Sequence, residues 1–251
     1  MTAVEVADGV LVTTSAIDVT TSTVVVRGSE ALLVDPAWTL GELDVLADLL
    51  VERGLVATAG FSTHAHHDHL LWHPRLGKVP RWASPRTAEL AAGEPSALLA
   101  QMGPGWPADV LELLGRVTTA DGDRLPEPWG EAELVVHDGH APGHTAVWLP
   151  ERGVLLAGDM LSDVELPLPF GPDDLPSYLA GLEVLAPYVA RAAVLVPGHG
   201  TPTTAPLARL DADRRYLDDV LTRGDSDDPR IGHLGMAEHH AHLQRLMRAG
   251  S

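Results

Sequence analysis

Residues Ser62 to Leu70 read Ser-Thr-His-Ala-His-His-Asp-His-Leu, and this stretch decides how the rest of the chain is interpreted. Four imidazoles and one carboxylate lie within six consecutive residues, from His64 to His69. A run with strand character, residues 57–63, precedes the cluster, so we expect the cluster on a loop at the carboxyl end of a strand. Crowded polar groups all need partners, and the stretch therefore indicates a site with chemistry rather than a structural feature.

Composition narrows the class of protein. The chain has 251 residues, a formal net charge of −18 and no cysteine. Its length allows one large or two small domains. Without cysteine, disulfides, thiolate metal ligands and cysteine nucleophiles are excluded. The negative charge repels phosphate backbones, which disfavours nucleic acid as a partner.

Cellular location and oligomeric state can be stated only as expectations from the sequence. No apolar run approaches the roughly 20 residues that span a bilayer, so no membrane partner is expected. The amino terminus lacks the basic and apolar regions of a signal peptide, which predicts a cytoplasmic protein. The oligomeric state stays open, with a homodimer as one alternative.

The order of elements predicts an α/β protein. Strand-like runs within residues 9–26 and at 31–34 suggest an antiparallel meander. Apolar residues at helical spacing predict a helix over 40–53. Further strands are expected at residues 79–83, 132–137, 145–149, 154–157 and 192–196. Further helices are expected to begin at Ser84-Pro85 and to cover residues 175–190, 206–222 and 236–248. Residues 93–130, with short helical pieces at 96–102 and 108–114, form either a lid over a cleft or an irregular surface excursion.

Three more motifs place a metal-competent side chain at the end of a predicted strand. They are Gly143-His144-Thr145, Gly158-Asp159 and Pro197-Gly-His199-Gly200. In each, a neighbouring glycine permits a tight turn that lets the side chain project into a cleft. Asp35, before Pro36, could also approach a site, but an Asp-Pro turn is the simpler interpretation.

The ordered set His64-x-His66-x-Asp68-His69, then His144, Asp159 and His199, resembles the metallo-β-lactamase-fold hydrolases. The resemblance covers roughly residues 9 to 200. It implies a four-layer αβ/βα sandwich, with residues 1–205 as a catalytic domain. Residues 206–251 are then a helical C-terminal extension packed on that domain.

The resemblance also implies a metal site. His64, His66 and His144 would hold one metal ion, Asp68, His69 and His199 a second, and Asp159 would bridge both. Two zinc ions suit the nitrogen and oxygen ligands best, with iron or manganese as alternatives. A hydroxide shared by the two ions would attack an ester, thioester, lactone or lactam. Asp68 would orient this nucleophile and pass a proton to the leaving group, whereas His67 is expected to point away.

Two other activities of the fold stay open, a mononuclear-iron persulfide dioxygenase and a phosphodiesterase or nuclease. The residues of the second metal site favour two metals over one, and the net charge disfavours a nuclease. The tail arginines (Arg209, Arg214, Arg215 and Arg223) match poorly the basic patch with which glyoxalase II-type thioesterases hold glutathione.

The remaining candidates have open roles. Ser162, Asp163 and Glu165 follow Asp159 and are candidates for contact with ligands or substrate. The tail histidines His233, His239, His240 and His242 are expected to face solvent, with a second metal site as the alternative. Trp72, Trp82 and Trp106 line either an apolar pocket or the core.

Overall fold

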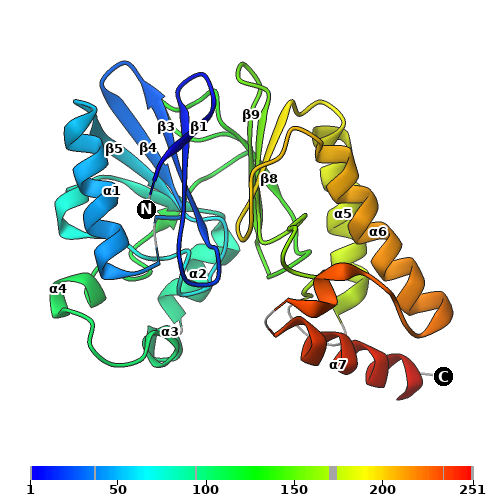
Figure 1. Ribbon diagram of the computed structural model, residues 1–251. Coiled ribbons are helices and arrows are strands. Elements are labelled where there is room, and N and C mark those ends of the chain that lie inside the picture. Colours follow the sequence, from blue (N-terminus) through cyan, green and yellow to red (C-terminus); the bar gives the residue numbers. More distant parts are fainter. Residues whose placement is uncertain (1, 37, 94, 170–173, 234, 250–251) are drawn as a thin grey trace.

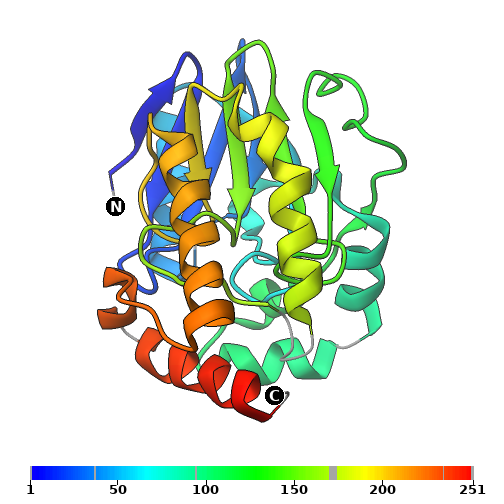
Figure 2. The same cartoon turned by 90° about the vertical axis from the view of Figure 1, so that its right-hand side faces the viewer.

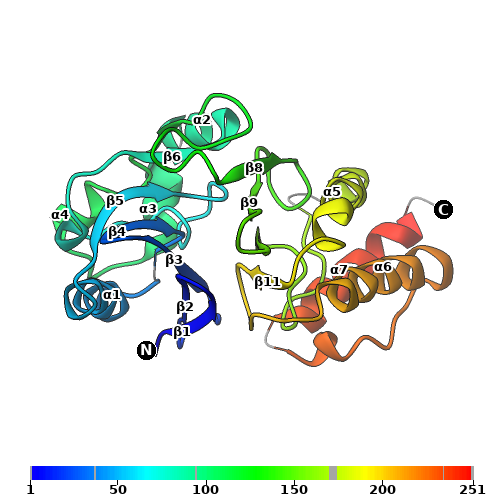
Figure 3. The same ribbon diagram turned by 90° about the horizontal axis from the view of Figure 1, so that it is seen from above.

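The computed structural model describes residues 2–36, 38–93, 95–169, 174–233 and 235–249. Two β-sheets face each other, and helices cover the outer face of each sheet (Figures 1 and 3). The four layers of the predicted αβ/βα sandwich are therefore present. The predicted domain ranges also include residues 1, 37, 94, 170–173, 234, 250 and 251, which lie outside the described residues.

The first sheet has seven strands within the described residues, in the order of the sequence. Neighbours pair antiparallel from β1 to β4 and parallel from β4 to β7. The strands are β1 (Val4–Ala7), β2 (Val10–Thr14), β3 (Thr21–Arg27), β4 (Glu30–Val34), β5 (Val56–Phe61), β6 (Arg81–Ala83) and β7 (Thr118–Thr119). The expected antiparallel meander is thus the first half of this sheet.

The second sheet has four strands in the described part of the chain, in the order β11-β10-β9-β8. They are β8 (Glu133–Val136), β9 (Thr145–Leu149), β10 (Val154–Gly158) and β11 (Val194–Pro197). β8, β9 and β10 pair antiparallel, whereas β10 and β11 pair parallel. β4 and β5 in the first sheet are also parallel neighbours, so carboxyl ends of adjacent strands meet in both sheets.

Helices of the first half are α1 (Leu40–Glu52), α2 (Pro85–Gly93), α3 (Pro95–Met102) and α4 (Ala108–Leu111). On the second sheet, α5 (Leu175–Val189) and α6 (Pro206–Arg223) lie side by side, and α7 (Met236–Ala249) crosses near their ends (Figure 2). The described part of the chain also has two short 3-10 helices, η1 (Pro74–Leu76) and η3 (Pro229–Gly232). None of the described helices is both long and apolar enough to cross a membrane.

Successive side chains along a strand point to opposite faces of its sheet, and in both sheets the side chains on the two faces are buried in the core. Leu32 and Val34 of β4 point between the sheets, while Leu33 points outward into the cluster that α1 covers. In β9, Val147 faces the first sheet and Trp148 packs toward α5. Because both faces are buried, these strands read as continuous apolar runs rather than as alternating ones.

The C-terminal helices are part of the same packing. Leu210 and Leu217 of α6 and Met236 and Leu243 of α7 belong to the apolar cluster that α5 forms with the second sheet. The division into a catalytic domain (1–205) and a C-terminal extension (206–251) stays a prediction. What the structure adds is that α6 shares a layer with α5.

Candidate metal centre

The candidate ligands gather at the carboxyl ends of strands from both sheets. The 62–70 loop follows β5, Asp159 follows β10, and His199 lies two residues beyond β11. A further histidine, His140, comes from the loop between β8 and β9. Strand ends from the two sheets therefore face one another across a single edge of the sandwich, where α/β folds place their chemistry.

A first group of ligand atoms consists of His64, His66, His140 and Asp159. Nδ1 of His66 lies 2.9 Å from Nε2 of His64 and 3.2 Å from Nε2 of His140. Oδ2 of Asp159 lies 3.3 Å from Nε2 of His64 and 3.5 Å from Nε2 of His140. Three imidazoles and a carboxylate thus converge on one point.

A second group consists of Asp68, His69 and His199. Nε2 of His69 lies 3.3 Å from Nε2 of His199 and 3.4 Å from Oδ2 of Asp68. Asp159 reaches this group as well, with Oδ1 3.2 Å from His69 and Oδ2 3.3 Å from His199. One carboxylate therefore touches both groups.

In four of these histidines, the far ring nitrogen has its own acceptor. Nδ1 of His69 donates to Asp35, and Nδ1 of His64 donates to the hydroxyl of Thr63. Backbone carbonyls do the same for the other two: Nδ1 of His140 donates to Leu168 at 2.8 Å, and Nδ1 of His199 to Asp18 at 2.8 Å. In the neutral form of each ring, Nε2 is then the acceptor aimed inward, which is the tautomer that a metal ligand requires.

These separations fit a bound metal ion. Tetrahedral zinc with ligands at about 2.0–2.1 Å holds its ligand atoms about 3.3 Å apart. Most pairs in both groups lie between 3.2 and 3.5 Å. Among the described residues, Oδ1 of Asp159 is buried without a hydrogen-bond partner. A buried, unsatisfied carboxylate oxygen among inward-facing lone pairs calls for a cation.

Electrostatics point the same way. Burial lowers the pKa of His140 to about 4 and that of His64 well below its ordinary value, so both rings are neutral at pH 7, as metal ligands must be. In the second group, the carboxylates of Asp159 and Asp68 overcome the effect of burial and raise the pKa of His69 well above its ordinary value. In the metal-free protein, His69 therefore holds a second proton beside these carboxylates, and a bound cation would take the place of that proton.

Close packing explains the glycines that flank these ligands. Gly158 has φ +57°, and a Cβ there would lie 2.4 Å from Nε2 of His144. A Cβ on Gly198 would lie 2.0 Å from Oδ1 of Asp159. Any side chain at either position would push Asp159 or its support out of place.

His144 is where the structure differs from the predicted ligand set. Its Nε2 accepts a hydrogen bond from the backbone N–H of Asp159 at 3.0 Å, and its Nδ1 faces His137. Within the described residues, the groups of ligand atoms include His140 and not His144. Both are preceded by glycine in one loop, and the pattern alone did not separate them. The structure gives His144 the task of anchoring the backbone of Asp159.

Asp35 also departs from the expectation that it only forms a turn. It is buried, has φ +48°, and its Oδ2 accepts from Nδ1 of His69 at 2.9 Å. His67 is outside both groups, as expected, and its Nδ1 donates to the side chain of Gln101. The 62–70 cluster is thus divided between the two groups, with His67 turned toward α3.

The three candidates after Asp159 have different surroundings. Ser162 donates to the carbonyl of His199 at 2.7 Å, and Asp163 pairs with Arg209 at 2.9 Å. Glu165 forms a third group of ligand atoms with Asp159 and His199. Of the three, Glu165 is the one whose carboxylate faces the candidate metal centre.

The tail histidines do not form a second centre among the described residues. His240 is buried, which differs from the expected solvent exposure, and it lies 3.0 Å from both the Tyr216 hydroxyl and the Asp225 carboxylate. His239 donates to the carbonyl of Pro167 at 2.9 Å. His233 and His242 are exposed as expected.

The three tryptophans divide between core and surface packing. Trp72 is buried in the core under α1. Trp82 is partly buried and packs against the apolar cluster between the sheets. Trp106 stacks on Trp38, with the ring centroids 6.0 Å apart. Packing is therefore the role that the structure gives all three.

A two-sheet sandwich with imidazoles and carboxylates converging at one edge is the arrangement of a metal-dependent enzyme. The family model described as the metallo-beta-lactamase superfamily matches residues 17–199. This range is well over half of the chain, and the chain therefore belongs to the metallo-beta-lactamase superfamily.

Individual relatives agree on the fold. A hydroxyacylglutathione hydrolase from Synechococcus sp. (strain JA-3-3Ab) is 32% identical over 131 residues, which are 52% of this chain and 44% of the relative. The match spans about half the length of the curated relatives. A beta-lactamase domain protein from Burkholderia ambifaria is 20% identical with a TM-score of 0.68, covering 99% of this chain and 89% of that one. A metallo-beta-lactamase family protein from Thermus thermophilus is 23% identical with a TM-score of 0.64, covering 96% and 93%.

Proposed function

We propose that this chain hydrolyses a small uncharged carbonyl compound, a thioester in the first place, at a centre of two zinc ions. The first ion would be held by His64, His66 and His140, and the second by Asp68, His69 and His199. The Asp159 carboxylate contacts both groups. The observation that carries the proposal is the convergence of inward-facing ring nitrogens and carboxylates at separations of 3.2 to 3.5 Å.

The number of ions rests on the second group. A mononuclear iron site would need fewer ligands, and the inward-facing atoms of Asp68, His69 and His199 would then have no cation to bind. The nitrogen and oxygen ligands suit zinc best, with iron and manganese as the alternatives. Two ions therefore account for more of the buried polar atoms than one.

When bound, two ions supply an activated water and a Lewis acid that polarises a carbonyl oxygen. The chain contributes orientation and proton transfer. Asp68 turns Oδ2 toward His69 and His199, which leaves Oδ1 to hold the proton that goes to the leaving group. The neighbouring imidazoles overcome burial and keep the pKa of Asp68 well below its usual range, so that it begins as a base.

The relatives named as hydroxyacylglutathione hydrolases support a thioester. Glutathione itself is less well supported. Arg209, Arg214 and Arg223 are each paired with a carboxylate of this chain, at 2.6 to 2.9 Å. A net charge of −18 also opposes an anionic substrate. We therefore expect the thiol part of the substrate to be uncharged.

An apolar pocket beside the first group supports a short acyl chain. Its volume is about 130 Å³, and His66 lies at its edge. Its apolar lining consists of Ala65, Leu90, Ala97, Leu98 and Ala141. A small apolar pocket of this kind suits a short acyl chain.

The test combines metal content with a substrate panel. Elemental analysis of the purified chain should give two zinc ions per chain. The zinc-loaded protein should then cleave short acyl thioesters faster than lactones, β-lactams or bis(p-nitrophenyl) phosphate. One iron and no zinc, or cleavage of the phosphodiester alone, would overturn the proposal.

A matched variant tests the shared carboxylate. Asp159→Ala should lower both metal content and hydrolysis, because Asp159 contacts both groups. Asp211→Ala is the control, because Asp211 is an exposed aspartate on α6, away from both groups. An Asp159→Ala protein that keeps two ions and full activity would refute the shared role.

A further inference from the structure

The loop of residues 162–168 reaches the metal centre at two points. The carboxylate of Glu165 lies with the ligand atoms of Asp159 and His199, all within 4.8 Å of one another. The carbonyl of Leu168 accepts the hydrogen bond from Nδ1 of His140 at 2.8 Å. The path of this loop therefore decides both where Glu165 stands and how the His140 ring is turned.

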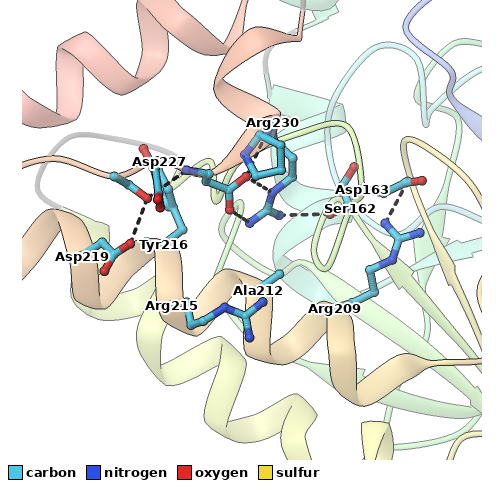
Figure 4. A pocket seen from close by; sticks show the side chains of 12 residues that line it. Ser162, Asp163, Arg209, Ala212, Arg215, Tyr216, Asp219, Asp227 and Arg230 are labelled. Carbon is cyan, nitrogen blue, oxygen red and sulfur yellow. Dashed lines mark hydrogen bonds and ion pairs between the residues drawn. The ribbon is translucent and has the colours of Figure 1, made fainter.

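The loop lies outside the strands, so its backbone groups need partners elsewhere. Arg230, in η3, supplies two of them. Its Nη1 donates to the carbonyls of Ser162 and Glu165, both at 3.0 Å (Figure 4 shows the first). One guanidinium thus holds the start and the middle of the loop.

The start of α7 holds the next two residues. The backbone N–H of Leu166 donates to the sulfur of Met236 at 3.2 Å. Nε2 of His239 donates to the carbonyl of Pro167 at 2.9 Å. Residues 165, 166 and 167 are therefore each bound by a C-terminal side chain, and the following carbonyl is the one that orients His140.

Arg230 is itself fixed by buried charges. Its Nη1 lies 2.5 Å from Asp213 of α6, and its Nε and Nη2 bind Asp228 at 3.0 and 2.9 Å. The side chains of Arg230 and Asp213 are 5% and 1% exposed. Tyr178 of α5 donates a further hydrogen bond to Asp213. Because a buried pair is costly to break, these bonds give the loop a rigid support.

We propose that Arg230, Met236 and His239, which we call the C-terminal clamp, are positioning residues that set the metal affinity of the first group. The clamp holds loop 162–168, and the loop holds His140 through the Leu168 carbonyl. Groups that orient a ligand in this way change metal affinity about 10–100-fold when they are lost. The inference rests on the proposed function in taking His140 as a ligand of one of two zinc ions, and not on which substrate is hydrolysed.

The first test removes one bond of the clamp at a half-buried position. His239→Leu should weaken one of two zinc affinities about tenfold in a competition titration against a chromophoric chelator, and leave the other within twofold. His140→Ala identifies which affinity belongs to the first group. His239→Gln can still donate to Pro167 and should restore the affinity. His242→Leu, one turn along the same helix and exposed, is the control.

The second test addresses the guanidinium. Arg230→Met should weaken the same affinity more than His239→Leu, since it frees two loop carbonyls. Arg214→Met is the control, because Arg214 lies on α6 and pairs with Glu183 at the surface. Wild-type affinity at both sites in folded His239→Leu protein would overturn the clamp and leave the proposed hydrolysis intact. A wild-type chain that binds two ions but cleaves nothing would overturn only the hydrolysis, whereas a chain that binds none would overturn both.

Discussion

Oδ2 of Asp35 lies 2.9 Å from Nδ1 of His69, and both residues are buried. Asp35 also accepts from the backbone N–H and the hydroxyl of Thr63, at 2.8 and 2.7 Å. That hydroxyl in turn accepts from Nδ1 of His64 at 3.0 Å. One carboxylate at the end of β4 therefore orients a histidine of each group, directly in one case and through Thr63 in the other.

Asp35→Asn should weaken zinc binding without unfolding the protein. Asparagine tolerates the φ of +48° at this position and keeps the size of the side chain. Its amide, however, would present a donor to His69, which favours the tautomer with a proton on Nε2. We expect zinc affinity at the second group to fall about 10–100-fold, measured by competition titration. Two unchanged affinities would show that Asp35 serves only the turn.

The variants His140→Ala and His144→Ala should affect zinc binding in different ways. His140 offers Nε2 to the first group, so its removal should reduce the zinc content from two ions to one. His144 holds the backbone N–H of Asp159. The His144→Ala protein should still bind both ions but with lower affinity, because the backbone of Asp159 loses its hydrogen bond to His144. Elemental analysis and zinc titration of the two variants separate these outcomes, and the reverse pattern would restore His144 as the ligand.

Removing the metal should lower the melting temperature. A ligand that binds only the folded state at 100 times its dissociation constant adds about 2.7 kcal/mol to the free energy of unfolding. For a chain of this size, that corresponds to roughly 5 to 11 °C. Calorimetry before and after chelation measures the shift, and Asp159→Ala should show a smaller one. An unchanged transition after verified removal would mean that the site is not coupled to folding.

Much of the fold could be predicted because the strands are buried on both faces. Runs such as Leu32 to Val34 and Val147 to Leu149 are apolar without interruption, and they are strands in the structure. β7 (Thr118–Thr119) was not predicted, because two exposed threonines in an irregular region carry no periodicity. β1 (Val4–Ala7) was also missed, since it is short and largely exposed at the sheet edge.

The site could be predicted where sequence neighbours act together. His64, His66, Asp68 and His69 are adjacent along the chain, and their spacing alone indicates metal. Site residues that are far apart in the sequence and meet only in the folded protein were harder to recognise. Asp35 reads as a turn residue, and Gly139-His140 resembles Gly143-His144. The two rings differ in whether Nε2 faces the carboxylate or the backbone N–H of Asp159, and this is a property of the packed loop.

Acid should destabilise the metal-free protein through His137. Burial lowers the pKa of His137 from 6.5 to about 4, so the folded state binds fewer protons than the unfolded state between these values. The contribution of neutral His137 to the free energy of unfolding is therefore complete above pH 6.5. It is lost as the pH falls toward 4, by at most about 1.4 kcal/mol per pH unit.

His137→Asn removes this titration and keeps an acceptor for the backbone N–H of Gly139. Urea unfolding of the metal-free protein at pH 7 and pH 5 should show a smaller loss of stability in the variant than in the wild type. His242→Asn, at an exposed position, should behave as the wild type does. Equal losses in wild type and His137→Asn would show that His137 does not titrate in this range.

The pocket beside His66 should set the preferred acyl length. Ala97 lines the pocket from α3 and is an exposed residue, so Ala97→Phe can fill the pocket at little cost in stability. We expect kcat/KM for butanoyl thioesters to fall about tenfold or more, while that for acetyl thioesters changes little. Ala100→Phe, on the same helix but outside the pocket lining, is the control. A filled pocket should exclude long acyl chains and still accept short ones. If Ala97→Phe slows the hydrolysis of all acyl lengths equally, the acyl chain binds elsewhere.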